Sequence, residues 1–484
     1  MKTIHISQYI KLSLLSASMI WISSCNKFLD KSPVSDLTTE NFYKTVNDAE
    51  SGLVGAYNGL GDQYYIWDFI SNSDARSDNA YAGGDNPDNF QIDNFTVTAT
   101  NGNVSRDWSG LYTQIGKANA VIDNVPNISD ALFSDPNRKE QIISEAKFLR
   151  AFHYYNLVTT YGKLPLVTSL TQDYYPSRSE VNDVYTQIIS DLKDADQYLA
   201  DPGKESETGR ATKGAAEALL AKVYAQMGDY VNCLDYCNKV LSWNYSLVSN
   251  YDYLFDGNHE NSSESIFEIQ HMAGTFGSYG PNMMLPASIT GEAWVKFNTP
   301  TQDLVKAMRS EGDSIRLHSS IVFDNTSNLP SPYTAAENPI PYVYKYRNPN
   351  GWSSPNNEIM IRLADIILLK AEALNSSTVN RSSEAIPLIN QIRTRVNLPA
   401  VSPSTQSDIK VAILKERRFE LAFEGQRWND LLRAGSDYTI QLMNSQVKGD
   451  GSSLNYSVNN NKLIFPVPQS ERNKNPNLDQ NAGY

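Results

Sequence analysis

The sequence predicts a mostly α-helical protein in which about four helix pairs form a scaffold, interrupted by long irregular insertions and a few short strands. Three observations lead to this class. Residues 209–241 read as two amphipathic helices joined by a tight turn. Similar helical patterns recur before and after this stretch. Between residues 246 and 358, in contrast, Asn, Ser, Gly and Pro are frequent and helical periodicity is mostly lost.

The helix pair at 209–241 has recognisable ends. Thr212 is a good N-cap, and the bulky side chains that follow recur at helical spacing beside a stripe of alanines. Gly228 suits the left-handed residue that ends a helix, and a second amphipathic helix runs to Leu241. Neither helix can bury both of its faces against the other, so pairs of this kind are expected to stack in an array resembling tetratricopeptide repeats.

The remaining elements follow in chain order. Further helices are expected at 48–61, 108–124, 139–161, 180–199, 361–375, 384–396, 409–424 and 425–433. The insertion 246–358 has strand-like runs at 265–270 and 342–346 and one helical stretch near 301–310. Residues 62–107 show no period and are interpreted as a long ligand-binding loop, since its aromatic residues argue against disorder. The chain thus divides into a leader (1–24), an N-terminal part (25–245) and a C-terminal part (246–484).

The N-terminus reads as a lipoprotein signal peptide. Lys2 and Lys11 precede an apolar run that ends at Ile22 and is shorter than the ~20 residues a bilayer crossing needs. Ile22-Ser23-Ser24-Cys25 resembles a bacterial lipobox, in which the cysteine becomes the lipidated mature N-terminus. We expect the lipid on Cys25 to be the protein's only contact with the membrane.

Charge and composition restrict the ligand. A net charge of −13 argues against binding to nucleic acid or to an anionic membrane surface. The chain holds 28 Tyr and 7 Trp beside many Asn, a mixture of flat apolar faces and hydrogen-bonding edges that suits polar, uncharged ligands such as sugars. Structural roles are nevertheless the commoner use of Tyr.

No catalytic, cofactor or metal motif stands out. None of the five histidines has metal-ligand spacing, and no nucleophile elbow or phosphate-binding Gly loop is present. Carboxylates are plentiful, so a glycosidase remains an alternative. The charged residues between Glu416 and Asp430 are interpreted as a structural ion-pair network, and Cys233 and Cys237 as buried thiols.

Motifs spread over almost the whole chain carry a family resemblance. They are Cys25-Asn-Lys-Phe-Leu-Asp30, Asp48-Ala-Glu-x-Gly-Leu-x-Gly-Ala-Tyr57, Glu145-Ala-Lys-Phe-Leu-Arg-Ala-Phe-His-Tyr-Tyr-Asn-Leu157 with Tyr161-Gly-Lys-Leu-Pro165, Ile361-Arg-Leu-Ala-Asp365, Glu416-Arg-Arg-Phe-Glu-Leu-Ala-Phe-Glu-Gly-Gln-Arg-Trp428, Phe465-Pro-Val-Pro468 and Gln480-Asn-Ala-Gly-Tyr484. In these motifs the sequence resembles the SusD/RagB family of outer-membrane nutrient-binding lipoproteins.

The resemblance implies a scaffold of four tetratricopeptide-like pairs and a function without catalysis. Such proteins lie on the outer face of the outer membrane as a lid on a SusC-like TonB-dependent transporter and capture oligosaccharide for import. The alternative is an interaction scaffold or lid whose cargo is a peptide or glycoprotein fragment.

In the family, residues from two loop regions form the glycan platform, so the resemblance places the candidate ligand residues in loop 62–107 and in the insertion. They are Asp74, Arg76, Asp78, Asn79, Tyr81, Asn86, Phe90, Phe276, Tyr279 and Trp294, with Trp352 as a further candidate. Tyr64 and Trp67 are interpreted as core residues.

Overall fold

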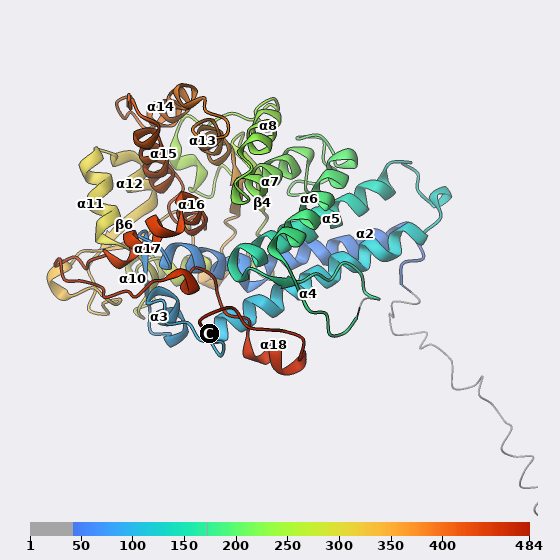
Figure 1. Ribbon diagram of the computed structural model, residues 1–484, viewed down its shortest axis with the longest axis horizontal. Coiled ribbons are helices and arrows are strands. Elements are labelled where there is room, and N and C mark those ends of the chain that lie inside the picture. The colour runs from blue at the N-terminus through green and yellow to red at the C-terminus, as the bar shows by residue number, and fades with distance from the viewer. Residues whose placement is uncertain (1–41, 172) are drawn as a thin grey trace, which may run out of the picture.

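The structure, a computed structural model, describes residues 42–171 and 173–484 (Figure 1). The predicted signal peptide and the lipidated Cys25 lie outside the described residues. Within the described ranges, no helix combines the length and apolar character that a membrane crossing requires.

Helices dominate the described part of the chain. The α-helices are α2 (Val46–Tyr57), α3 (Pro87–Asp93), α4 (Gly102–Asn124), α5 (Arg138–Tyr161), α6 (Val181–Tyr198), α7 (Lys213–Gln226), α8 (Tyr230–Val240), α9 (Gly280–Met284), α10 (Ala287–Thr290), α11 (Gln302–Glu311), α12 (Ser314–Ser320), α13 (Leu363–Leu374), α14 (Ala385–Arg395), α15 (Gln406–Glu420), α16 (Arg427–Ala434), α17 (Ser436–Asn444) and α18 (Gln469–Lys474). Shorter helical turns used below are η2 (Asn58–Gly61), η3 (Tyr64–Asp68), η4 (Ser71–Ala75) and η9 (Asn350–Trp352).

The strands form two-stranded antiparallel sheets, namely β1 (Ala80–Gly83) with β5 (Phe297–Pro300), β2 (Leu164–Pro165) with β3 (Arg178–Ser179), β4 (Ser265–Ile269) with β8 (Glu358–Arg362), and β6 (Ile321–Asp324) with β7 (Ile340–Val343).

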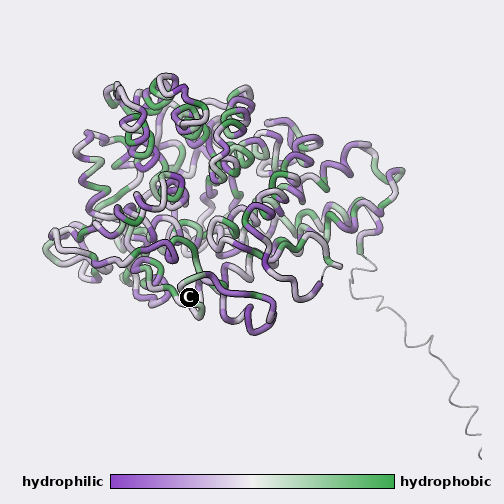
Figure 2. Tube along the Cα trace, in the orientation of Figure 1, coloured by the Kyte–Doolittle hydropathy of each residue, from purple (hydrophilic) through white to green (hydrophobic). Residues whose placement is uncertain are grey.

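The predicted array of helix pairs is confirmed. Thr212 caps α7 by accepting a hydrogen bond from the backbone of Ala215, and Gly228 adopts the left-handed conformation (φ 77°) between α7 and α8. Helices α4 to α8 pack in succession, and α8 packs directly on α13 although the insertion separates them in sequence. In Figure 1 the array therefore continues from α5 through α8 to α13. Hydrophobic residues recur along its helices in Figure 2, as expected for elements covered on successive faces.

The prediction of an aperiodic loop at 62–107 is wrong in its local structure. Residues 64–75 form the π-helical turns η3 and η4, β1 and α3 follow, and α4 begins at Gly102 rather than at residue 108. A π-helical turn closes hydrogen bonds five residues apart, so its buried positions do not repeat every 3.6 residues. Both η3 and η4 are also buried along their whole length, which removes any contrast between an inner and an outer face.

The charged residues near the C-terminus form the predicted ion-pair network. Arg362 Nη1 lies 2.6 Å from Glu420 Oε1, Arg362 Nε lies 2.7 Å from Glu424 Oε2, and Arg316 Nη1 lies 2.7 Å from Glu416 Oε1. All of these side chains are buried. Burial alone would raise the pKa of the Glu420 carboxyl, but the surrounding guanidinium groups hold that pKa below its usual range.

Two further interpretations are confirmed by burial. Cys233 and Cys237 are buried free thiols on α8. Tyr64 and Trp67 lie in the main hydrophobic core.

Candidate functional site

The fold brings the two predicted ligand regions together. Strand β1 pairs with β5 so that Tyr81 lies opposite Thr299, and the Gly84 backbone N–H donates to the carbonyl of Lys296 over 2.7 Å. Figure 1 accordingly shows the early α3 region beside elements of the insertion and of the C-terminal part. The two regions nevertheless expose very different side chains.

Asp74 and Asn79 are fully buried and bonded to each other and to the C-terminal half. The Asp74 carboxylate accepts hydrogen bonds from Asn79 Nδ2 (2.9 Å) and from the backbone N–H groups of Phe423 (3.0 Å) and Gly425 (3.2 Å). Burial raises the pKa of Asp74 to about 6 despite these donors. Both side chains hold η4 and the following turn against the segment between α15 and α16.

Asp78 and Arg76 are equally enclosed. Asp78 accepts two hydrogen bonds from Arg427 (2.7 and 2.8 Å) and pairs with Arg418 Nε at 3.0 Å. Burial would raise the pKa of Asp78, but the two guanidinium groups hold it at about 2. The Arg76 guanidinium lies within 4.4 Å of the ring centroids of Trp428 and Phe465, and burial lowers its pKa to about 10.

Tyr81 contributes to packing, and Asn86 to a helix cap. Tyr81 is buried edge-on against Tyr333, with ring centroids 5.7 Å apart. Asn86 caps α3 by accepting a hydrogen bond from the Asp88 backbone over 2.8 Å. Phe90 lies on α3 and is partly exposed. Asp74, Arg76, Asp78, Asn79 and Tyr81 therefore do not face solvent in this fold, and we leave them out of the site proposed below.

Trp294 and Trp352 stack on each other at the surface of the insertion. Their ring centroids are 5.7 Å apart and their planes differ by 19°. Trp294 is half-buried against Phe297, whereas Trp352 is 44% exposed. Trp352 also has a left-handed backbone (φ 71°), which is strained for an aromatic residue and is found preferentially at functional sites. A stacked indole pair in partial contact with water can receive a flat apolar ligand surface.

Glu292 and Lys296 hold this pair. The Glu292 carboxylate accepts a hydrogen bond from Trp294 Nε1 at 3.0 Å and another from Trp352 Nε1. Lys296 Nζ lies 3.6 Å from the Trp294 ring centroid and 3.5 Å from Glu292 Oε2. Burial lowers the pKa of Lys296 to about 8, although Glu292 opposes this shift. We call Glu292, Trp294, Lys296 and Trp352 the tryptophan platform.

Helix α9 contacts the platform through Asn282. Helix α9 packs on η9, and Asn282 on α9 donates to Glu292 Oε2 over 3.3 Å. Tyr279, just before α9, is partly exposed; burial raises its pKa, and the charge of Asp68 raises it further. Arg106 pairs with Asp68 at 2.7 Å and keeps part of its side chain in solvent. Phe276 lies on the loop preceding Tyr279 and is 54% exposed.

The two indoles were among the candidates predicted from the sequence, whereas Glu292, Lys296 and Asn282 were not. The sequence did contain a signal for Glu292 and Lys296. Residues 292, 294 and 296 alternate along an extended segment, and side chains two apart in such a segment point to the same side. Asn282 reaches the platform only through the packing of α9, which local sequence does not reveal.

Carboxyl groups differ in accessibility: Glu292 of the platform is partly exposed, whereas Asp68 and Asp107 are buried. Arg106 pairs with Asp68 at 2.7 Å, and Asn72 Nδ2 donates to Asp107 Oδ2 over 2.8 Å. Burial, followed by the charge of Asp68, raises the pKa of Asp107 well above its usual range. Among residues 42–171 and 173–484, no three His, Cys, Asp or Glu side chains are grouped to hold a metal ion.

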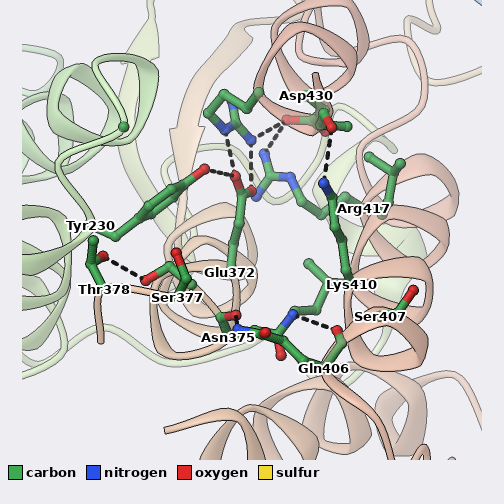
Figure 3. A pocket seen from close by; sticks show the side chains of 16 residues that line it. Tyr230, Glu372, Asn375, Ser377, Thr378, Gln406, Ser407, Lys410, Arg417 and Asp430 are labelled. Carbon is green, nitrogen blue, oxygen red and sulfur yellow. Dashed lines mark hydrogen bonds and ion pairs between the residues drawn. The ribbon is translucent and has the colours of Figure 1, made fainter. Parts of the chain in front are cut away.

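A hollow of about 500 Å³ at another place in the fold lies among α8, α13, α15 and α16 (Figure 3). Its inner wall consists of paired charges: Arg417 bonds Asp430 at 2.9 Å, and Arg433 bonds Glu372 and Asp430 at 2.9 and 2.7 Å. These cations are satisfied by the protein itself, so the wall is part of the structural ion-pair network.

Comparison with known proteins places the chain in a family. The model described as the SusD family matches residues 264–484, and the model described as "Starch-binding associating with outer membrane" matches residues 27–225. SusD-like protein P2 of Formosa agariphila is 30% identical, over 94% of this chain and 96% of its own. The chain belongs to the SusD family.

Other SusD-family proteins extend the comparison. The starch-binding protein SusD of Bacteroides thetaiotaomicron is 24% identical over the full length of both chains. Among solved structures, a laminarin binding SusD-like protein superposes with a TM-score of 0.77 at 27% identity, covering 91% of this chain and 100% of its own. The surface glycan-binding protein A of Bacteroides fluxus has the same fold, with a TM-score of 0.78 at 23% identity over 91% of this chain and 100% of its own. The mostly helical scaffold is that of SusD-like proteins.

Proposed function

We propose that this SusD-family protein binds a glycan on its surface and that the tryptophan platform is the contact site. The observation that carries the proposal is the partly exposed Trp294–Trp352 stack, whose indole nitrogens are both bonded to Glu292. The apolar face of a sugar ring packs on an indole, while its hydroxyl groups need hydrogen-bonding partners at the edge. The partly exposed Glu292 carboxylate supplies such a partner at the edge of the stack. Relatives named for binding starch and laminarin support the ligand class.

The apolar surface available for contact predicts weak to moderate affinity for the ligand. The exposed part of Trp352 amounts to on the order of 100 Å², and covering it yields about 2.5 kcal/mol. Binding also removes translational and rotational freedom of the ligand, which costs at least as much. One indole is therefore insufficient, and we propose that successive sugar units contact the stacked pair and its polar surroundings together.

The proposed cellular role is capture without chemistry. We propose that Cys25 carries the lipid that anchors the protein to the outer membrane, with its body on the exterior, and that the captured oligosaccharide passes to a SusC-like TonB-dependent transporter. The family model described as associating with the outer membrane supports the location. Relatives named for binding starch and laminarin support a role without hydrolysis.

The test uses the soluble body, residues 26–484, and its Trp294→Ala/Trp352→Ala variant. A glycan array selects the oligosaccharide, and calorimetry measures its dissociation constant. We expect the wild type to bind at least one neutral oligosaccharide and the variant to lose that binding while it still unfolds in one cooperative transition, at a lower temperature because Trp294 packs on the core. Heat from peptides alone would favour the scaffold with peptide cargo, and release of reducing ends would identify a glycosidase.

A further inference from the structure

A second hollow lies beside the loop that carries Phe276. It has a volume of about 570 Å³ between the end of α2 with η2, the turn at 207–210, and the segment 268–277. An adjoining hollow of about 300 Å³ shares four lining residues with it, Thr208, Gly209, Arg210 and Glu268. The two hollows adjoin at these residues, and we call them together the side trench. Each volume lies at or above the lower end of the range of small-molecule sites.

The side trench combines apolar and hydrogen-bonding surfaces. Its lining includes the buried side chains of Leu60 and Ile66 and the exposed amide of Asn58; the Gln270 amide is also exposed but is bonded to Asn261. Phe276, 54% exposed, also lines it. A free aromatic face with amide groups around it is the combination that a hydroxyl-rich ring compound needs.

The cationic side chains in the trench are paired within the protein, and its unpaired charge is an anion. Arg210 bonds Glu145 at 3.0 Å and Glu207 at 2.6 Å, and His271 pairs with Glu358. Among the described residues, Glu268 forms no ion pair, and it accepts hydrogen bonds from the neutral amide groups of Asn261 and Asn357. A phosphate or carboxylate ligand would find no free cation at these residues. The chemistry therefore favours an uncharged ligand.

The side trench and the tryptophan platform share one loop. Residues 275–277 line the trench. The same loop is bound to the segment after Trp352: Ser278 and Ser354 exchange both backbone hydrogen bonds at 2.8 Å, and Ser353 Oγ donates to the Gly274 carbonyl at 2.6 Å. Hydrogen-bonded segments of this kind lie about 5 Å apart. A ligand chain of several units that rests on Trp352 can therefore reach the trench across this loop.

We propose that the side trench is a second carbohydrate-binding site that receives the continuation of a chain held by the tryptophan platform, with Phe276 as its aromatic contact. The proposal rests on the proposed glycan-binding function and adds chain-length selection to it. The platform alone determines the affinity for a short oligosaccharide. The trench contributes only when the chain is long enough to span both.

The test compares Phe276→Ala with Trp352→Ala on trisaccharide and decasaccharide ligands of the glycan that the wild type selects on an array. Phe276→Ala is expected to bind the trisaccharide as the wild type does and the decasaccharide roughly tenfold more weakly, because it loses one aromatic contact. Trp352→Ala is expected to weaken both. Met272→Ala is the matched control: Met272 is an exposed apolar residue on the same loop that does not line the trench, and its removal is expected to change neither affinity.

The outcomes separate the two proposals. Equal decasaccharide affinities of Phe276→Ala and the wild type, with Trp352→Ala still impaired, would overturn the side trench and leave the platform in place. A Met272→Ala variant that is as impaired as Phe276→Ala would overturn the trench as well, since the loop rather than the trench would then be responsible. No glycan binding by the wild type would overturn the proposed function itself.

Discussion

Residues 74–81 and residues 292–296 are alike in composition but have opposite surroundings. Both stretches mix charged residues with an aromatic one and lack helical periodicity. In the first, Asp78 is enclosed by Arg418 and Arg427 from the C-terminal helices, so its charge stabilises the fold. In the second, Glu292 is bound by side chains of the insertion, and the indoles it holds remain partly exposed. Partners distant in sequence decide which of two polar–aromatic stretches becomes buried structure and which becomes surface.

The largest effect should come from breaking the buried stretch. Asp78→Ala leaves two guanidinium groups without their carboxylate and is expected to lower the free energy of unfolding by about 3–5 kcal/mol in chemical denaturation. Asp303→Ala is the control, because Asp303 pairs with the same Arg418 at 2.7 Å from an exposed position and is expected to cost less than about 1 kcal/mol. Equal losses in the two variants would contradict the contrast between buried and exposed pairs.

The contribution of residues 74–81 to the free energy of unfolding should also depend on pH. Because burial raises the pKa of Asp74 to about 6, above an unfolded value of about 3.9, the folded state retains a proton that the unfolded state releases between these values. The stability linked to Asp74 is therefore complete below about pH 4 and falls by up to about 3 kcal/mol as the pH rises through 6. Measured from pH 3.5 to 7, the wild type should lose this stability relative to Asp74→Asn; parallel curves would show that Asp74 does not titrate there.

Removing the exposed indole should affect binding and not folding. Trp352→Ala is expected to weaken oligosaccharide binding by about 2 kcal/mol, roughly thirtyfold, with the free energy of unfolding unchanged within about 1 kcal/mol. The control is Tyr174→Ala, which removes an aromatic ring that is 93% exposed on another segment. If calorimetry shows the same loss for Tyr174→Ala, binding to exposed aromatic residues is nonspecific.

The smallest predicted effect concerns the carboxylate that bridges the indoles. Glu292→Ala is expected to weaken binding by about 1 kcal/mol, because the two rings lose their shared acceptor. Combined with Trp352→Ala it should add little, since residues in one hydrogen-bonded unit couple. Glu292→Gln keeps one carbonyl acceptor and should retain part of the affinity. Fully additive losses in this double-mutant cycle would separate Glu292 from the platform.

The helices of the array were predictable from local sequence. Thr212 and Gly228 mark the ends of α7 by their own conformational preferences, and the helical spacing of its bulky residues identifies the helix between them. Turns η3 and η4 were not predictable. A π-helical turn that is buried on all sides has neither a 3.6-residue period nor a contrast between an apolar and a polar face, and a helix prediction depends on both.

The site was predictable only as a set of candidates. Trp294 and Trp352 are bulky aromatic residues in irregular segments, which marked them as surface candidates. Their stacking depends on the packing of α9 against η9, and so does the approach of Asn282 to Glu292. Asp74 and Asp78 had the same local character, and only the Arg residues and backbone groups far along the chain distinguish them.

The most direct test is a crystal structure of the protein with the oligosaccharide that it binds most tightly. The account predicts a sugar ring packed on the Trp352 indole, with the Trp294–Glu292–Trp352 arrangement retained and no sugar contact to residues 74–81. A sugar bound against residues 74–81, or at any place that leaves both indoles in solvent, would contradict it.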